Sequence, residues 1–383
     1  MEMKPPTFLD LFAGAGGWSI GFEEAGLSHV AMYDFNESAC NTARENFGDI
    51  VNWVDLSKHR EVTFPKVNIV CGSPPCQGFS NEGYKRKDDP RNSLVWAFLE
   101  IIEDIQPDVW IFENVPGFKR SYGGHYYSLL KQRLKSWDYH WSDFILNAAD
   151  YGVPQNRKRF IVIAAKDFRP HAPSPTHNKY DSCLLGETPH VNLWDAISDL
   201  PIPTLGDRIG EYEYDSKPRN NYQKWARHGS LSVSNHTTQK HSARVVEKIR
   251  AVPIGGDMSH LTGSYEENSV HYCGGYRRAL KNRPSYTAYW TRGMTSIHPE
   301  QHRFLSPREC ARIQSFPDRF HFCGTTIENY TQICNAVPPL LARAIADSVC
   351  KQMYSSKTAS AVLSLAANNL ADFPCTKSQS VLP

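Results

Sequence analysis

The chain has 383 residues, of which 40% are hydrophobic and 12% aromatic, so it is long enough for one large domain or two ordinary ones with buried cores. Its formal net charge of +2 is nearly neutral, so a polyanionic partner must be met by a local basic surface and not by the overall charge. We find neither an N-terminal signal segment nor an apolar run near the ~20 residues of a membrane helix. The 10 cysteines include no C-x-x-C pair, which argues against a zinc or redox pair. These features predict a cytoplasmic protein with free thiols.

The first half of the chain alternates short apolar runs with amphipathic stretches. Strands are predicted at residues 7–12, 29–35, 67–72, 109–115, 140–148 and 159–165, and helical stretches at 18–26, 37–47, 93–105 and 126–137. This alternation predicts an α/β fold with a parallel, doubly wound sheet covered by helices.

The pattern changes at about residue 170. Residues 170–295 are rich in Pro, Gly, Ser, Thr, Asn, His and Tyr, which predicts a loop-rich second domain or a large insertion. Helical signals return at residues 306–316 and 338–353, where Ser-Pro and Pro-Pro pairs suit helix N-termini.

Cys76 is the first candidate catalytic residue, in the segment SPPCQGFS at residues 73–80. Residues 67–72 predict a buried strand, and the two prolines that follow cannot extend a sheet ladder. The thiol is therefore expected in a stiff turn at the strand's carboxyl end, the edge where open α/β sheets bind ligands. By itself this context leaves a catalytic and a structural role equally open, because a free cysteine is most often a small buried apolar residue.

A glycine-rich turn directly follows the first predicted strand. Gly14 and Gly16 precede an amphipathic stretch, and glycines there let a ligand approach the backbone closely. The spacing does not match G-x-G-x-x-G, so a plain tight turn is the alternative. Asp34 ends the second predicted strand, where such folds bind ribose hydroxyls, and the neighbouring Phe35 could stack on an adenine ring. Asp55 closes the third turn and could accept from an exocyclic amine, although an exposed loop acid needs no function.

Six motifs in a fixed order make the chain resemble the DNA (cytosine-5) methyltransferase family over most of residues 7–350. They are DLFAGAGG (10–17), SPPCQGFS (73–80), ENV (113–115), QNRKRF (155–160), RFLSPRECARIQSFPD (303–318) and NAVPP (335–339). The resemblance implies a Rossmann-like S-adenosylmethionine-binding domain, a smaller loop-rich target-recognition domain, and a last motif packed beside the first. It implies methyl transfer to C5 of a flipped-out cytosine in a short specific sequence of double-stranded DNA, as in bacterial and phage restriction-modification systems, and no metal.

The resemblance assigns the catalytic roles. Cys76 would add as a thiolate to C6 of the cytosine, because C5 alone is too weak a nucleophile to attack a methyl sulfonium. Glu113 would hold N3 and the exocyclic amine of the base. Arg159 would reach the cytosine O2, and Arg157 would support the catalytic loop or the DNA backbone; a surface basic cluster is the alternative for this segment alone.

The resemblance also assigns the cofactor contacts and marks one departure. Relatives have Gly before the Asn of the last motif, whereas this chain has Cys334. A side chain there could crowd the cofactor or require a changed backbone angle, but the small Cys is expected to be tolerated. The cofactor-binding residues carried over are Phe12, Gly14, Gly16, Asp34, Phe35, Asp55, Leu94, Asn335 and Ala336.

The loop at residues 77–93 resembles the segment that closes over the flipped base in this family. Ser80, Lys85 and Arg86 would meet DNA phosphates there. A solvated charged loop is an equally open explanation for the individual basic residues.

The loop-rich region carries the second set of predicted DNA contacts. Residues 215–250 hold eight Lys or Arg against two acids, and residues 277–292 hold five against none. Such a surface suits DNA phosphates and the major groove. Within it, the GGYRR segment is the predicted base-reading loop, through Arg277 and Arg278.

The resulting domain prediction has four parts: the first part of the catalytic domain (1–177), the target-recognition domain (178–294), a return to the catalytic domain (295–352) and a tail without an assigned role (353–383). The predicted partner is double-stranded DNA, the chain is expected to be a monomer, and a cognate restriction endonuclease is left open.

Two alternatives to a DNA methyltransferase remain. One is a tRNA cytosine-5 methyltransferase of the same fold, although the Cys-Phe-Thr motif of that subgroup is absent from the recognition region. The other is a catalytically silent DNA-binding member, against which the intact Cys76, Glu113 and Arg159 argue.

Overall fold

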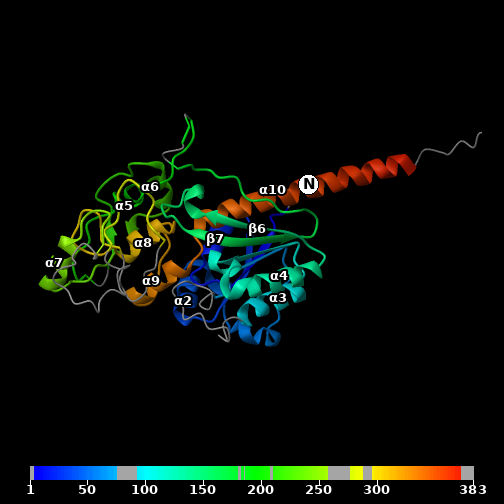
Figure 1. Cartoon of the computed structure of the whole chain (residues 1–383), viewed down its shortest axis with the longest axis horizontal. Coiled ribbons are helices and arrows are strands. Elements are labelled where there is room, and N and C mark those ends of the chain that lie inside the picture. Colours follow the sequence, from blue (N-terminus) through cyan, green and yellow to red (C-terminus); the bar gives the residue numbers. More distant parts are fainter. Residues whose placement is uncertain are drawn as a thin grey trace, which may run out of the picture.

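The structure is a computed structural model that describes residues 4–75, 93–179, 183–184, 186–207, 210–257, 277–287 and 296–371. It has two lobes, one built around a β-sheet and one rich in loops and short helices (Figure 1). The first half of the chain and the last helix form the sheet lobe, and the intervening segments form the other. The described cysteines form no disulfides with one another.

Within the described residues, seven strands form one sheet in the order β3-β2-β1-β4-β5-β7-β6. The first five strands in this order are mutually parallel, as predicted. The prediction of a wholly parallel sheet is wrong for β7, which lies antiparallel between β5 and β6. The short connection 148–157 causes this, since a parallel neighbour would need a longer crossover. The strands are β1 (Thr7–Leu11), β2 (Ser28–Asp34), β3 (Val51–Trp53), β4 (Ile69–Gly72), β5 (Val109–Asn114), β6 (His140–Asn147) and β7 (Lys158–Ala165).

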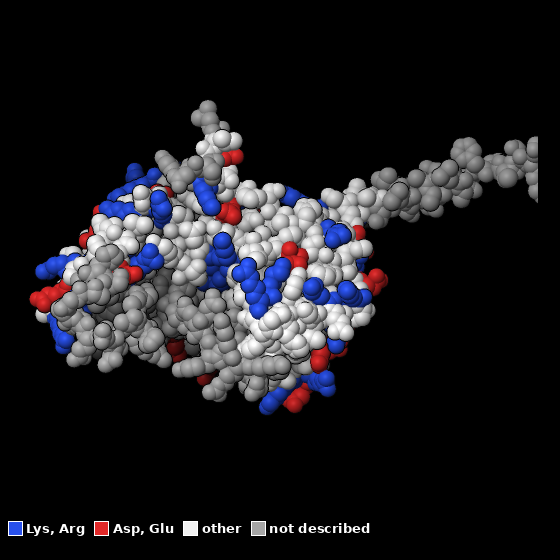
Figure 2. All heavy atoms as spheres, in the orientation of Figure 1, with Lys and Arg blue, Asp and Glu red and all other residues white. Residues whose placement is uncertain are grey.

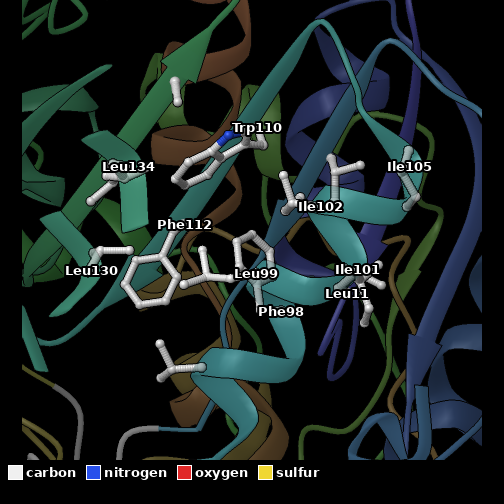
Figure 3. Close-up of a cluster of buried hydrophobic side chains, with 14 of the residues drawn as sticks. Leu11, Phe98, Leu99, Ile101, Ile102, Ile105, Trp110, Phe112, Leu130 and Leu134 are labelled. Carbon is white, nitrogen blue, oxygen red and sulfur yellow. The ribbon is translucent and has the colours of Figure 1, made fainter. Parts of the chain in front are cut away.

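Helices cover both faces of the sheet, which confirms the doubly wound arrangement. The side chains of β5, an interior strand of the sheet, alternate between the two resulting cores. Trp110 and Phe112 pack with Phe98 and the other apolar residues of α3 and α4 (Figure 3), while Ile111 faces α1 and α10. The helices of this lobe are α1 (Gly17–Glu24), α2 (Glu37–Phe47), α3 (Ser93–Ile105), α4 (His125–Lys135) and α10 (Pro339–Ala371), with 3-10 helices η1 (Gly48–Ile50), η2 (Leu56–Glu61), η4 (Pro116–Lys119), η5 (Ser121–Gly124) and η6 (Ala148–Tyr151).

The last motif packs directly against the first, as the family resemblance implied. A Cβ on Gly17, the first residue of α1, would lie only 2.1 Å from the Val337 carbonyl oxygen. Glycine is therefore required for this close approach. One helical stretch, Thr326–Ala359, is long and apolar enough to cross a membrane, and the sequence analysis did not predict it. However, 67% of its most apolar window is buried inside the protein. That degree of burial is typical of a core helix.

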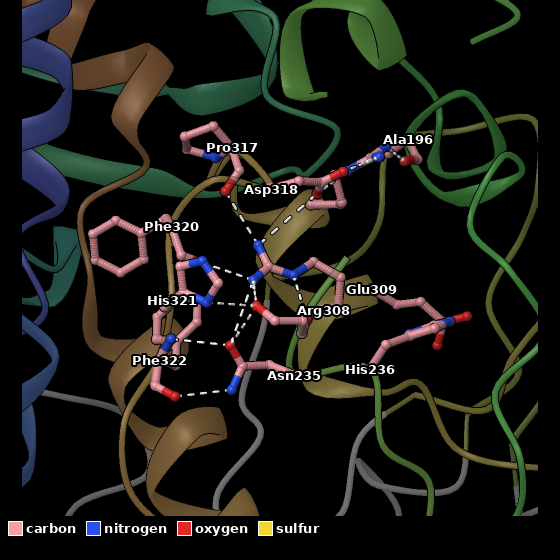
Figure 4. Close-up of polar contacts among 12 residues, drawn as sticks. Ala196, Asn235, His236, Arg308, Glu309, Pro317, Asp318, Phe320, His321 and Phe322 are labelled. Carbon is pink, nitrogen blue, oxygen red and sulfur yellow. Dashed lines mark hydrogen bonds and ion pairs between the residues drawn. The ribbon is translucent and has the colours of Figure 1, made fainter. Parts of the chain in front are cut away.

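The second lobe contains little regular structure and is organised by buried arginines. Arg308 is fully buried, and its guanidinium donates to the carbonyls of Ser234, Pro317 and Phe320 (Figure 4). The motif at residues 303–318 is therefore hydrogen-bonded both to a loop of the middle region and to the segment that leads back to the sheet lobe. The elements of this lobe are α5 (Leu193–Ile197), β8 (Tyr212–Glu213), α6 (Asn221–Ala226), β9 (Ser232–Val233), α7 (Ala243–Ala251), α8 (Pro307–Ile313) and α9 (Thr326–Asn335).

Candidate active site and DNA interface

The carboxyl ends of β1, β2, β4 and β5 meet the start of β7 at one edge of the sheet. The antiparallel direction of β7 matters here, because it brings the beginning of that strand beside the end of β5. Most of the residues predicted from the sequence to bind the cofactor or act in catalysis lie along this edge.

The glycine-rich turn after β1 forms an open cradle. Phe12, Gly14 and Gly16 all have positive φ angles, of 55°, 56° and 93°. A Cβ built on Gly14 would meet no atom within 4 Å, so the space beside this backbone is free. A left-handed turn bordered by open space, at the N-terminus of α1, fits the close approach of a nucleotide-like ligand.

Asp34 ends β2 and supports this turn. Its two carboxylate oxygens accept from the backbone amides of Gly14 and Asn36, both at 2.8 Å. Burial raises the pKa of Asp34 above its ordinary value, although these amide hydrogen bonds act in the opposite direction. The neighbouring Phe35 is 59% exposed, as expected for an aromatic ring that receives a ligand.

Trp53 is a residue that the sequence reading missed. Its indole is 56% exposed and donates to the Phe35 carbonyl over 2.8 Å, so it fixes the backbone that carries the Phe35 ring. The sequence analysis predicted no strand at Val51–Trp53, because three residues are too few to show an alternating pattern. Asp55, two residues on, uses one carboxylate oxygen to cap η2 through the amide of Ser57. This hydrogen bond lowers the pKa of Asp55.

The remaining predicted cofactor residues occupy helix ends. Leu94 is the second residue of α3 and is partly exposed, while Asn335 ends α9 and is exposed. Ala336 is the C-cap of α9, and its carbonyl accepts from Gln314. Cys334 is a buried helical residue of α9, so the replacement of glycine requires no left-handed backbone.

Cys76 lies outside the described residues, as do Ser80, Lys85 and Arg86. The turn that leads to Cys76 is described up to Pro75 and is held from two sides. Trp18 of α1 donates to the Ser73 hydroxyl over 2.9 Å, and Asn114 of β5 donates to the Pro74 carbonyl over 3.2 Å. Asn114 belongs to the ENV motif, and this tether was not predicted.

Glu113 and Arg159 form a buried ion pair at this edge. The Arg159 Nε lies 2.8 Å from Glu113 Oε1, and both side chains are only about a tenth exposed. The strand register explains the contact: Glu113 is paired with Ile161, and Arg159, two residues earlier on β7, points to the same face. The sequence predicted both residues at the site but not their pairing.

Arg157 makes a contact that the sequence did not predict. Its side chain is buried, and its guanidinium donates to the carbonyls of Cys334 and Ala336 at 2.7 and 3.3 Å. Arg157 therefore braces the last motif against the strand that carries Arg159.

A buried acid lies beneath the glycine-rich turn. Asp10 of β1 is completely buried, and its carboxyl accepts from the Ser19 hydroxyl over 2.8 Å. Burial raises the pKa of Asp10 to about 7. Asp10 begins the DLFAGAGG motif, but its burial could not be read from that motif.

The two predicted base-reading arginines behave differently. Arg278 is buried, and its guanidinium donates to the carbonyls of Ile249, Val252, His298 and Gln301. The prediction that Arg278 contacts DNA is therefore wrong for this arrangement, because its donors are used to hold loop backbone. Arg277 is partly exposed.

Basic side chains gather on one face of the protein. Figure 2 shows Lys and Arg over the loop-rich lobe and over the middle of the same face, near β7 and α4. The exposed basic residues of the described part of the loop-rich region include Lys217, Arg219, Lys224, Lys240 and Arg250. Within the residues that the structure describes, no group of three or more His, Cys, Asp or Glu side chains is arranged to hold a metal ion.

Comparison with known proteins gives a consistent result. The family model for C-5 cytosine-specific DNA methylases matches residues 6–351. The Type II methyltransferase M1.HphI of Haemophilus parahaemolyticus is 34% identical over 360 residues, which cover 90% of this chain and 87% of that protein. M.DdeI of Desulfomicrobium norvegicum is 32% identical over 376 residues, covering 90% and 88%.

Solved structures share the architecture. An Escherichia coli prophage protein described as a DNA modification methyltransferase aligns with a TM-score of 0.73 and 25% identity, over 91% of this chain and 99% of that one. The Entamoeba histolytica methyltransferase EhMeth aligns with a TM-score of 0.54 and 17% identity, over 92% and 99%, and shares the fold.

Proposed function

The chain belongs to the family of C-5 cytosine-specific DNA methylases, and from this membership we propose that it is the protective methylase of a restriction-modification system. It is a DNA (cytosine-5-)-methyltransferase, and its substrate is a cytosine turned out of a short specific sequence of double-stranded DNA. The observation that carries the proposal is the buried Glu113–Arg159 pair, which lies at the same sheet edge as the turn leading to Cys76.

Cys76 begins the reaction by adding as a thiolate to C6 of the cytosine. An S–C6 bond forms, and the C5=C6 π electrons move toward C5 and N3. Glu113, which pairs with Arg159 as a carboxylate before the base enters, takes up a proton from solvent with the base and delivers it to N3. Arg159 holds Glu113 in place and donates to the cytosine O2. Once C5 carries the methyl group, the N3 proton returns to Glu113. Water then removes the C5 proton, the C5=C6 bond re-forms, the S–C6 bond breaks and the Cys76 thiolate leaves.

S-adenosylmethionine fits the cradle after β1. The open space at Gly14 would receive the ligand beside the backbone, and Phe35 offers an exposed ring for the adenine. Asp34 would accept from ribose hydroxyls while it holds the turn, and Phe12, Gly16, Asp55, Leu94, Asn335 and Ala336 would complete the site. When bound, S-adenosylmethionine supplies the methyl group as an electrophile, and S-adenosylhomocysteine is its product.

DNA would lie between the two lobes. Ser80, Lys85 and Arg86 would meet its phosphates from the sheet lobe, and Arg277 of the GGYRR segment would contact DNA from the recognition lobe. We assign residues 1–177 and 295–352 to the catalytic domain and 178–294 to target recognition, with 353–383 as a tail. The enzyme would act as a monomer in the cytoplasm, associated with the nucleoid, while a separate endonuclease cuts unmodified sites.

The test is methyl transfer from S-adenosylmethionine to unmethylated plasmid DNA, read by single-base sequencing for 5-methylcytosine. Cys76→Ala is the matched control, because it removes only the nucleophile. Cysteine-dependent marks at one short sequence would support the reaction and its specificity together. Marks on tRNA alone would refute the DNA substrate, and a folded protein that binds DNA but marks neither nucleic acid would be a silent member.

A further inference from the structure

A stacked arginine-tyrosine pair stands out on the recognition lobe. The Arg277 guanidinium carbon lies 3.6 Å from the centroid of the Tyr286 ring, and a guanidinium nitrogen donates to the Tyr286 hydroxyl over 2.8 Å. Tyr286 is 40% exposed. The ring and the hydroxyl together fix the plane and the rotation of the guanidinium. Its Nε is buried and makes no hydrogen bond within the described residues, so a ligand would meet a terminal nitrogen of the guanidinium.

The same segment is hydrogen-bonded to the strand that enters the active site. The Ser285 amide donates to the Pro154 carbonyl, and the Asn156 amide donates to the Ser285 carbonyl, both at 2.8 Å. The Thr287 hydroxyl adds a third bond, to the Asn156 carbonyl, at 2.6 Å. Tyr286 therefore sits between two residues that are fixed to the sheet lobe.

These bonds place the Tyr286 segment beside the chain that leads into β7. Ser285 pairs with Gln155, and Asn156 is three residues before Arg159, so about 10 Å of extended chain at ~3.3 Å per residue joins this contact to the catalytic ion pair. A cytosine held at Glu113 would therefore bring the DNA backbone on one side of it toward Arg277.

We propose that Arg277 contacts a DNA phosphate close to the target cytosine, and that Tyr286 is the positioning residue that holds its guanidinium for this contact. The inference rests on the proposed DNA substrate. A phosphate is favoured over a base edge because Tyr286, on which the Arg277 guanidinium is stacked, is anchored beside the sheet lobe, where the strand backbone must pass to deliver the base.

The test measures binding of an unmethylated duplex fragment at several salt concentrations between about 50 and 200 mM. Loss of one phosphate contact reduces the slope of log affinity against log salt by about 0.9, equally for fragments with and without the target sequence. Arg277→Ala should show this reduction, and Arg277→Lys should retain most of the wild-type slope. Arg169→Ala is the matched control, because this exposed arginine follows the far end of β7 and its loss should leave the slope unchanged. The last residue of β7, Ala165, is about 20 Å from Arg159 at ~3.3 Å per residue.

Tyr286 separates positioning from a purely structural role. Tyr286→Phe keeps the ring and should weaken binding about two- to tenfold through the lost hydrogen bond. Tyr286→Ala should approach Arg277→Ala, and combining the two should add nothing, because they disable one contact. Unchanged melting temperature and S-adenosylmethionine binding would show that the variants are folded.

Two results would overturn the inference. The first is a salt-dependence slope for Arg277→Ala equal to that of Arg169→Ala. The second is an Arg277→Ala enzyme that keeps the wild-type slope but prefers a different target sequence, which would indicate base reading. Wild-type methyl transfer is measured in parallel. If it is absent while the slopes change as expected, the proposed function fails and the contact stands. If methylation occurs and the slopes are equal, the contact fails and the function stands.

Discussion

Replacing Glu113 by Gln tests how strongly methylation depends on the carboxyl group at the end of β5. Gln has nearly the same size, and its side-chain oxygen can still accept from the Arg159 Nε, which lies 2.8 Å from Glu113 Oε1. The local geometry should therefore persist. The amide cannot deliver a proton to N3 of the cytosine, so the addition of Cys76 to C6 should lose its acid.

General acid catalysis contributes roughly 10²- to 10⁴-fold, so we expect the methyl-transfer rate of Glu113→Gln to fall by that factor. This equals about 2.7–5.4 kcal/mol of activation free energy at ~1.36 kcal/mol per decade. Arg159 also donates to the Lys158 carbonyl and would keep its bond to the new amide. The free energy of unfolding should therefore fall by only about 1–3 kcal/mol.

The assay is single-turnover transfer of labelled methyl groups to unmethylated plasmid, with denaturant unfolding of the same preparations. Glu103→Gln is the matched control, because Glu103 also pairs with an arginine, Arg133, but at the far end of α3. A folded Glu113→Gln enzyme whose rate is within tenfold of wild type would refute the assigned role of Glu113.

Three further substitutions test the framework. Arg312→Met removes a buried guanidinium that donates to both oxygens of Asp318, so the unfolding free energy should drop by about 3–5 kcal/mol in a urea titration; a loss below about 1 kcal/mol would contradict this. Burial raises the pKa of Asp10 from 3.8 to about 7, so its contribution to the unfolding free energy is full below pH 3.8 and is lost as the pH rises through 7. The loss amounts to about 4 kcal/mol at ~1.36 kcal/mol per pKa unit. The unfolding free energy of Asp10→Asn should lack this pH dependence, and equal pH slopes for wild type and variant would refute the reasoning. Gly17→Ala would force a Cβ to within 2.1 Å of the Val337 oxygen and should lower stability by about 1–3 kcal/mol, visible as a reduced melting temperature; an unchanged value would show that the two motifs can separate.

Local patterns in the sequence predicted most of the sheet lobe. Strand periodicity and β-branched runs predicted β1, β2 and β4 to β7 to within a few residues, whereas the short strand β3 was not predicted. The Ser-Pro pair predicted the start of α8, where Ser306 caps the helix in a capping box with Glu309. These features are set by neighbours a few residues apart, so they can be read from one chain. The direction of β7 could not, because strand direction depends on how a connection packs.

Residue type also predicted the active-site edge better than it predicted individual contacts. Glu113 and Arg159 follow from their motifs, but their ion pair depends on a register between two antiparallel strands. Arg278 was assigned to DNA because it lies in a basic segment, yet it holds the backbone of residues 20 to 29 positions away. A sequence shows the charge of an arginine but not whether carbonyls or solvent surround it.

The sequence by itself determined the α/β fold, the family and the residue types that the chemistry requires. These follow from short-range periodicity and from motifs that are each a short contiguous segment of the chain. Only the tertiary structure decided which of those residues meet. It turned β7 so that Arg159 reaches Glu113, buried Asp10 beneath the cofactor turn, and joined Ser285 to Asn156, since each of these contacts connects segments that lie far apart along the chain.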